Sequence, residues 1–199
     1  MGTTTLNQLP YPELTDPADV PADIKRLADK LDPLLRPTVV TSLPGAPTDG
    51  QEVYYSTGGV LWHLRYDSAS AKWKFLGGPP LTSITFSPAA TASGTYAPID
   101  GPTVAVPLPG DYLVRLSTNG NGSAVAVTGL AAIKPGTAAA NDNNAAIFFA
   151  TSVGGTVQSV VERTFTLTAA ASFDTHYRAL GGTGNWPARA MVVTPIRLG

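Results

Sequence analysis

The sequence has no cysteine, which excludes disulfide bonds and thiolate metal sites. It has only two histidines and two methionines, so other soft ligands are also scarce, and we expect no cofactor and no bound metal. Charged residues make up 14% of the 199 residues, against about a quarter in typical soluble domains. The net charge of −1 lacks the basic excess typical of nucleic-acid-binding proteins. No apolar run approaches the ~18 residues of a membrane span. We therefore expect neither nucleic acid nor membrane insertion.

Turn-forming and strand-favouring residues are abundant instead. The chain has 20 glycines, 18 prolines and 24 threonines. Glycine and proline favour turns, whereas threonine favours strands. Hydrophobic residues reach 43%, which is near normal and argues against a disordered chain. This composition predicts a mainly β fold.

Residues 1–40 are predicted to form an N-terminal arm followed by one helix. Prolines and a lack of periodicity in residues 1–15 indicate an extended arm. Asp19 is a candidate N-cap, and Pro33 predicts that the helix ends near Leu31. Apolar side chains recur at spacings of four and three residues, which is a heptad pattern. This apolar seam consists of Val20, Ile24, Leu27, Leu31 and Leu34.

A helix of about three turns is too short to be stable alone in water. The apolar seam is therefore expected to pack against a partner. We favour self-association of several copies, because the spacing is that of a coiled coil. Packing on the chain's own β domain and docking on another protein are the alternatives.

Residues 41–80 are predicted to form a connector rich in proline and glycine, followed by a β meander. Strands are expected at Glu52–Ser56, Val60–Tyr66 and Lys72–Leu76, separated by turn residues. This segment holds two of the three tryptophans. Such a three-stranded sheet is too thin to be stable alone, so we expect it to pack against a neighbour.

Residues 81–199 are predicted to form one β domain. Alternating apolar and polar residues, with glycine, proline and asparagine between the runs, favour a β-sandwich or jelly roll. Only 11 of these residues are charged, which favours a symmetric assembly over a monomer coated with threonine, serine and asparagine. Asn119–Gly122 has the composition of a hairpin turn. Strands are expected at Leu81–Phe86, Thr95–Ile99, Thr103–Leu108, Asp111–Ser117, Ser123–Thr128, Ala145–Thr151, Thr156–Leu167 (one strand or two), Ser172–Leu180 and Arg189–Leu198.

Residues suited to catalysis are few. A Ser–His–Asp arrangement needs a histidine base, and only His63 and His176 are present. Both lie in predicted strands, where a structural or exposed histidine is the simpler interpretation. The Gly-x-Ser-x-Gly elbow of hydrolases is absent. Asp100 and Asp111 adjoin glycine and proline, so we interpret them as turn formers rather than a hydrolytic pair. We expect no enzymatic activity and assign no catalytic residue.

Three residues of the β domain are candidates for surface recognition. Trp186 either covers the end of the core, which we favour, or stacks on a sugar ring. His176 and Arg178 alternate on one face of a predicted strand and offer polar contacts. Asn141–Asn144 is rich in oxygen ligands but lacks the glycine and the closing glutamate of a calcium loop. We therefore interpret it as a polar loop.

Three stretches of the sequence carry a resemblance to a known class of proteins. Residues 9–35 (LPYPELTDPADVPADIKRLADKLDPLL) resemble the opening of tail and minor structural proteins from tailed phages of actinobacteria. Residues 49–81 look like a module that recurs in those proteins, with the elements Asp49–Val53, Trp62–Tyr66 and Trp73–Phe75. The C-terminal region is similar to the trimeric jelly-roll knobs of phage fibres, which share their architecture with C1q and tumour-necrosis-factor domains. The cues there are Pro109–Val114, Phe173–Leu180 and Arg189–Gly199.

The resemblance implies a virion structural protein, assembled in the host cytoplasm. It implies a homotrimeric short fibre, spike or minor tail protein, attached to other virion proteins through residues 1–40 and contacting a host-surface glycan or protein. The first alternative is a capsid head-fibre or decoration protein. The second is a carbohydrate-binding module or polysaccharide depolymerase.

Overall fold

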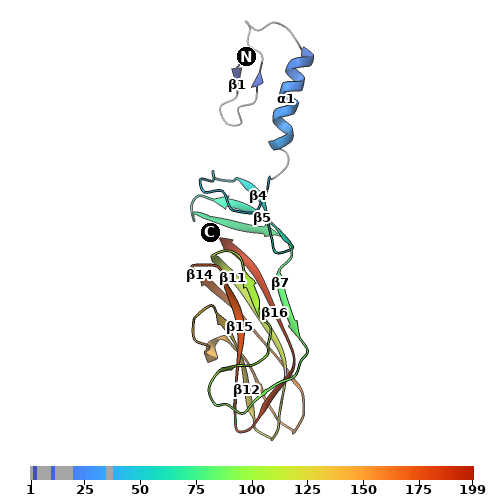
Figure 1. Ribbon diagram of the computed structural model, residues 1–199, viewed down its shortest axis with the longest axis vertical. Helices are drawn as coiled ribbons and strands as arrows, with labels where there is room; N and C mark the ends of the chain where they lie inside the picture. Colours follow the sequence, from blue (N-terminus) through green and yellow to red (C-terminus); the bar gives the residue numbers. More distant parts are fainter. Residues whose placement is uncertain (1, 4–9, 12–19, 35–37) are drawn as a thin grey trace.

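The computed structural model describes residues 2–3, 10–11, 20–34 and 38–199 (Figure 1). Within them the fold is mainly β, with two large sheets and the single α-helix α1 (Val20–Leu34). Figure 1 shows a sandwich at one end, the β meander stacked on it, and α1 beyond the meander. The described part of the predicted arm contains two short paired strands, β1 (Gly2–Thr3) and β2 (Pro10–Tyr11).

The large sheet is organised around β16 (Gly184–Leu198), the longest strand. One edge of β16 pairs with β11 (Gly110–Gly122), which in turn pairs with β14 (Val157–Leu167). The other edge is shared by three strands in succession. These are β8 (Ala89–Thr91), β7 (Leu81–Thr85) and, through Arg197 and Leu198, β6 (Lys72–Gly77).

The meander extends this sheet beyond β6. It adds β5 (Val60–Asp67), β4 (Glu52–Thr57) and the parallel edge strand β3 (Thr38–Val40). Trp73 lies opposite Leu198, so the backbone of the meander continues directly into the sandwich. A meander too thin to stand alone thus obtains its neighbour by strand pairing.

A smaller sheet faces the sandwich part of the large sheet. Its order is β10 (Val104–Val106), β15 (Ala171–Leu180), β12 (Thr128–Pro135) and β13 (Ala145–Phe149), and β9 (Ala97–Pro98) also pairs with β15. The 3-10 turn η1 (Asp142–Asn144) precedes β13. From β10 to β16, each strand lies in the opposite sheet from the strand before it, except that β12 and β13 lie in the same sheet. This alternation is the strand order of a jelly roll.

One cluster of buried apolar side chains runs through the meander and the sandwich together. Trp62, Tyr112, Phe148 and Trp186 are each at most 1% exposed. Tyr112, Val114 and Leu116 point inward from β11, while Phe173, Tyr177 and Ala179 point inward from β15, as the predicted alternation requires. The core is therefore continuous from the meander to the far end of the sandwich.

Two local predictions are wrong. The expected strand Ser123–Thr128 is a loop in which Ala126 adopts a positive φ of 67°, and the strand follows it as β12. Asn119–Gly122 is not a hairpin turn but the end of β11. Gly120 serves packing there, because a Cβ atom on it would lie 2.1 Å from the Phe148 ring.

The helix is longer than predicted, because it continues through Pro33 to Leu34. A proline lacks the N–H that would bond the carbonyl four residues earlier, but in the last turn only one such bond is lost. The candidate N-cap Asp19 lies outside the described residues.

Candidate functional site

The outer face of the sandwich part of the large sheet exposes several large apolar side chains. Alternation turns every second residue of β14, β11, β16 and β7 away from the core. The register places Val160, Ser117, Ala190 and Ile84 side by side across four strands. We call this surface the apolar face and define it by Ile84, Phe86, Val160, Ala188, Ala190 and Val192.

Large apolar side chains on the apolar face are unusually exposed. Ile84 is 61% exposed, Phe86 75% and Val160 46%. Ile84 and Phe86 line a groove of about 240 Å³, together with Ala188 and Ala190 and with polar residues that include Asn119, Gln158 and the buried Arg189. Small alanines beside exposed ring and branched side chains give the face both projections and a hollow, which suits close packing against a second surface.

Charged side chains are few on the apolar face. Alternation places Arg115 of β11 and Glu162 of β14 on this face, where they lie opposite each other in the register. A lone charge would have to be desolvated on burial, whereas adjacent opposite charges can pair. The apolar face is therefore chemically suited to being covered.

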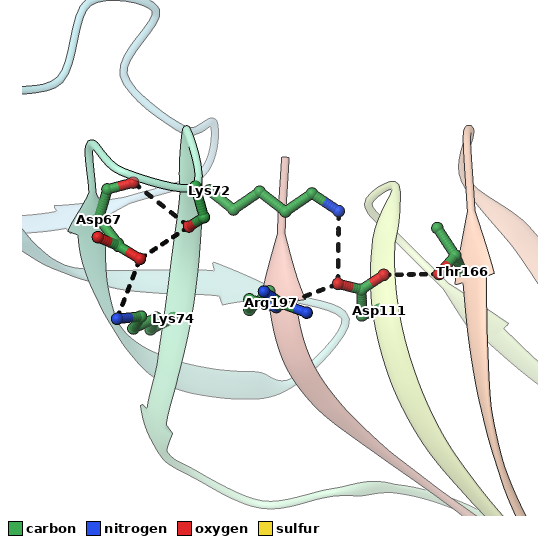
Figure 2. A network of polar contacts seen from close by, with 7 residues as sticks. Asp67, Lys72, Lys74, Asp111, Thr166 and Arg197 are labelled. Carbon is green, nitrogen blue, oxygen red and sulfur yellow. Dashed lines mark hydrogen bonds and ion pairs between the residues drawn. The ribbon is translucent and has the colours of Figure 1, made fainter.

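A polar joint connects the meander to the sandwich at one end of the apolar face. Figure 2 shows Lys72 of β6 and Arg197 of β16 approaching the same carboxylate oxygen of Asp111 on β11. The Lys72 Nζ–Oδ2 distance is 3.4 Å and the Arg197 Nε–Oδ2 distance is 3.2 Å. The Thr166 hydroxyl on β14 donates to Oδ1 at 2.7 Å.

The joint favours the ionised carboxylate. The Thr166 hydrogen bond, together with the charges of Lys72 and Arg197, holds the pKa of Asp111 below its usual value although burial opposes this. Asp111 stands at the strand entry expected from its turn sequence, but its side chain is only 10% exposed. Sequence reasoning missed its role, since the partners come from residues 39 to 86 positions away.

The structure places Trp186 in the core, which corrects its assignment as a candidate surface residue. Its side chain is 0% exposed and packs against Phe148 and Tyr177, with ring centroids 5.7 Å and 4.9 Å away. The physical reason is the alternation of side chains along a strand: Trp186 occupies an inward-facing position of β16, next to the inward-facing Tyr177 of β15. The favoured interpretation, a tryptophan covering core, fits this position.

His176 and Arg178 point to the opposite side of β15 from Tyr177 and stay partly exposed. Arg178 donates to the Asp142 carboxylate at 2.5 Å and lies over the Tyr96 ring, while the Tyr96 hydroxyl donates to the same carboxylate at 2.9 Å. Burial, aided by Lys134, lowers the pKa of His176. The three predicted recognition residues therefore do not form one site.

Arg189 has a structural role that the sequence did not reveal. Its side chain is 1% exposed. The guanidinium donates to the carbonyl oxygens of Ser87 at 2.7 Å, Asp100 at 2.6 Å and Trp186. It thereby ties the irregular segment before β10 to β16, and buried charge of this kind needs such partners.

The apolar seam of α1 is partly open. Val20 and Ile24 are 64% and 62% exposed, and Leu27 and Leu31 are half-buried, while the Leu34 side chain lies outside the described part. On the polar side, Lys25 and Asp29 form an ion pair at 2.6 Å. Docking of this seam on a partner remains a prediction.

In the described residues we find no group of three or more histidine, aspartate or glutamate side chains placed to hold a metal ion. His63 instead pairs with the Glu52 carboxylate at 2.8 Å on the exposed side of the meander. No described helix has the length and apolar character needed to cross a membrane.

No family model and no curated protein matches this chain. Among solved structures, it is similar to the Eiger TNF from S. frugiperda, with 11% identity, a TM-score of 0.38 and coverage of 57% of this chain and 92% of that one. It is similar to infectious bursal disease virus Gt strain, with 10% identity, a TM-score of 0.42 and coverage of 78% and 50%. It is also similar to the carbohydrate binding module CBM6cm-2 from Cellvibrio mixtus lichenase 5A in complex with cellotriose, with 13% identity, a TM-score of 0.28 and coverage of 70% and 90%.

Proposed function

We propose that this chain is a non-enzymatic structural protein of a phage particle, a homotrimeric short fibre, spike or minor tail protein. The proposal depends on the apolar face, on which Ile84, Phe86 and Val160 are exposed and Ile84 and Phe86 line a groove. Contiguous exposed apolar surface marks an interaction site, and a symmetric assembly would bury it between copies. The subunit number and the phage come from the sequence resemblance.

We assign a different role to each successive part of the chain. Residues 1–40 attach to other virion proteins through the arm and the apolar seam, and they help to bring copies together. The apolar face then holds the sandwiches against one another. The far end of each sandwich faces away from the particle and is free to meet the host surface.

Sedimentation of the purified full-length protein tests the assembly. We expect a mass three times the chain mass of 20.6 kDa. Ile84→Asp and Phe86→Asp each place an unpaired carboxylate in the contact, which costs several kcal/mol on burial, so both variants should sediment as smaller species. Ile147→Asp is the matched control, because Ile147 is 41% exposed on the other sheet.

A wild-type monomer at high concentration would contradict the proposed assembly. A trimer that survives both Ile84→Asp and Phe86→Asp would show that another surface holds it together. Purified phage particles should contain the protein by mass spectrometry, and antibody labelling would then locate it on the tail or on the head.

A further inference from the structure

The far end of the sandwich is a single surface made by three loops. β11 runs from Gly110, beside the meander, to Gly122 at this end. The Ser123 amide donates to the Thr183 carbonyl at 2.9 Å, and the Gly154 amide donates to the Gly122 carbonyl at 3.1 Å. Loops that are far apart in sequence are therefore hydrogen-bonded into one tip, at the opposite end of the molecule from α1 (Figure 1).

This tip carries no charge. The segments that build it and the adjoining strands, residues 116–133, 143–161 and 179–188, contain no lysine, arginine, aspartate or glutamate. The charged residues of the sandwich lie elsewhere: in the joint around Asp111, beside Arg178, at the Lys134–Asp174 pair of β12 and β15, at Asp100 before β10, and in the large sheet. A partner recognised here is thus not recognised through ion pairs.

Apolar side chains stand at the apex of the tip. Val125 is 61% exposed and Val153 is 66% exposed. Next to Val125, Ala126 has a φ of 67°, in the left-handed region that residues with a Cβ rarely adopt. The Ala126 amide is fixed by a hydrogen bond to the Ala150 carbonyl at 2.8 Å. Strained residues that the surrounding structure holds in place are concentrated at binding sites.

We propose that this tip binds a neutral polysaccharide, and we define the distal surface by Ser123, Val125, Thr151, Ser152, Val153 and Thr183. A neutral glycan brings hydroxyl groups and C–H faces but no charge. Its hydroxyls can exchange hydrogen bonds with the Ser123, Thr151 and Ser152 side chains, which are exposed, and its C–H faces can cover Val125 and Val153.

Charge balance favours this ligand over the other candidates. An anionic polymer or an anionic lipid surface needs lysine or arginine, and the tip has none. A typical protein surface would bring charged groups that lose water and find no partner on the distal surface. This inference rests on the proposed attachment role, because several tips held by one particle would add avidity to weak single contacts.

The test uses the full-length protein on beads that carry neutral polysaccharides (dextran, mannan and galactan) or anionic ones (heparin and hyaluronate). We expect retention on at least one neutral bead and none on the anionic beads. Val125→Asp and Val153→Asp should each weaken retention at least tenfold, because a carboxylate would be buried against C–H groups. Leu61→Asp, on the meander, is the matched control, since Leu61 is 45% exposed and far from the tip.

The inference is overturned by no retention on any neutral bead, by retention on anionic beads alone, or by equal retention of Val125→Asp, Val153→Asp and the Leu61→Asp control. Binding only to a host protein or to lipid vesicles would also overturn it. Sedimentation of the same sample separates the two proposals. If the protein is a trimer but binds no glycan, only the proposal that the distal surface binds a polysaccharide is refuted. If it is a monomer that binds glycan, only the proposed assembly is refuted.

Discussion

Replacing Asp111 by asparagine should weaken the joint between the meander and the sandwich. The change keeps the size of the side chain, and the amide oxygen can still accept the Thr166 hydrogen bond. It removes the negative charge that holds Lys72 at 3.4 Å and Arg197 at 3.2 Å. These two cations, brought together by the carboxylate, would then repel each other.

The expected loss can be worked out from exposure. A hydrogen bond to a charged group contributes about 1.5–3 kcal/mol when it is buried. The Asp111 side chain is 10% exposed, but Lys72 and Arg197 are 28% and 47% exposed, so solvent screens part of each contact. We expect Asp111→Asn to lower the free energy of unfolding by about 1–2 kcal/mol at pH 7.

The effect of Asp111→Asn on stability should depend on pH in a defined direction. Because the pKa of Asp111 is lowered by folding, the charged form stabilises the fold above the unfolded pKa of about 3.9. That contribution is lost as the pH falls through the lowered folded value. The difference between wild type and Asp111→Asn should therefore be full at pH 7 and should shrink steadily below pH ~4.

Urea unfolding, followed by tryptophan fluorescence between pH 7 and pH 2.5, measures both quantities. Trp62 and Trp73 report on the meander and Trp186 on the sandwich. The continuous core predicts one shared transition. Asp67→Asn is the control, because Asp67 pairs with Lys74 at 3.0 Å inside the meander and does not bridge the joint. Equal stability of wild type and Asp111→Asn at pH 7, or a difference that persists undiminished at pH 2.5, would refute the reasoning.

Two further substitutions probe packing and docking. Gly120→Ala should destabilise the sandwich by about 1–3 kcal/mol, because its Cβ would overlap the Phe148 ring, whereas Gly45→Ala has open space and should be nearly neutral in the same urea experiment. Ile24→Asp combined with Leu27→Asp should weaken oligomerisation, measured by sedimentation, or attachment to the particle, measured by incorporation into phage. Unchanged behaviour in both assays would show that the apolar seam has no role in either.

The strands that the sequence predicts well are those with large alternating side chains. Tyr112, Val114 and Leu116 on β11, like Phe173 and Tyr177 on β15, differ strongly in size and polarity from their neighbours, so their inward face is visible in the sequence. The mainly β fold and the sandwich follow from this periodicity together with the turn residues between the runs.

The misses share one cause, which is a partner distant in sequence. β12 escapes detection because its inward positions include Gly129 and Ala131, small residues that are poor strand signals. Gly129 is required there because a Cβ would lie 2.1 Å from the ring of Phe148, as at Gly120. Nothing local indicates that the Phe148 ring fills the space between these two strands.

The listing of Trp186 as a possible surface residue fails for a related reason, whereas the favoured interpretation of a core tryptophan fits. The sequence around Trp186 is rich in glycine, asparagine and proline, which is typical of exposed loops. Yet β16 begins at Gly184 and turns the indole inward against Phe148 and Tyr177. The exposed groups that matter for the proposals, Phe86 and Val125, instead lie where a strand ends or a loop closes, and local pattern does not distinguish them from core residues.

The distribution of charge along the molecule connects the proposals. Charged side chains gather at the joint, where Lys72, Asp111 and Arg197 fasten the meander to the sandwich. They become sparse on the apolar face and absent at the distal end. If low charge served only to bury faces between copies, the exposed tip would have no reason to lack it, because an exposed end is where charge aids solubility. A charge-free end beyond the apolar face is what the proposed neutral polysaccharide would require, since such a ligand has no charge to pair.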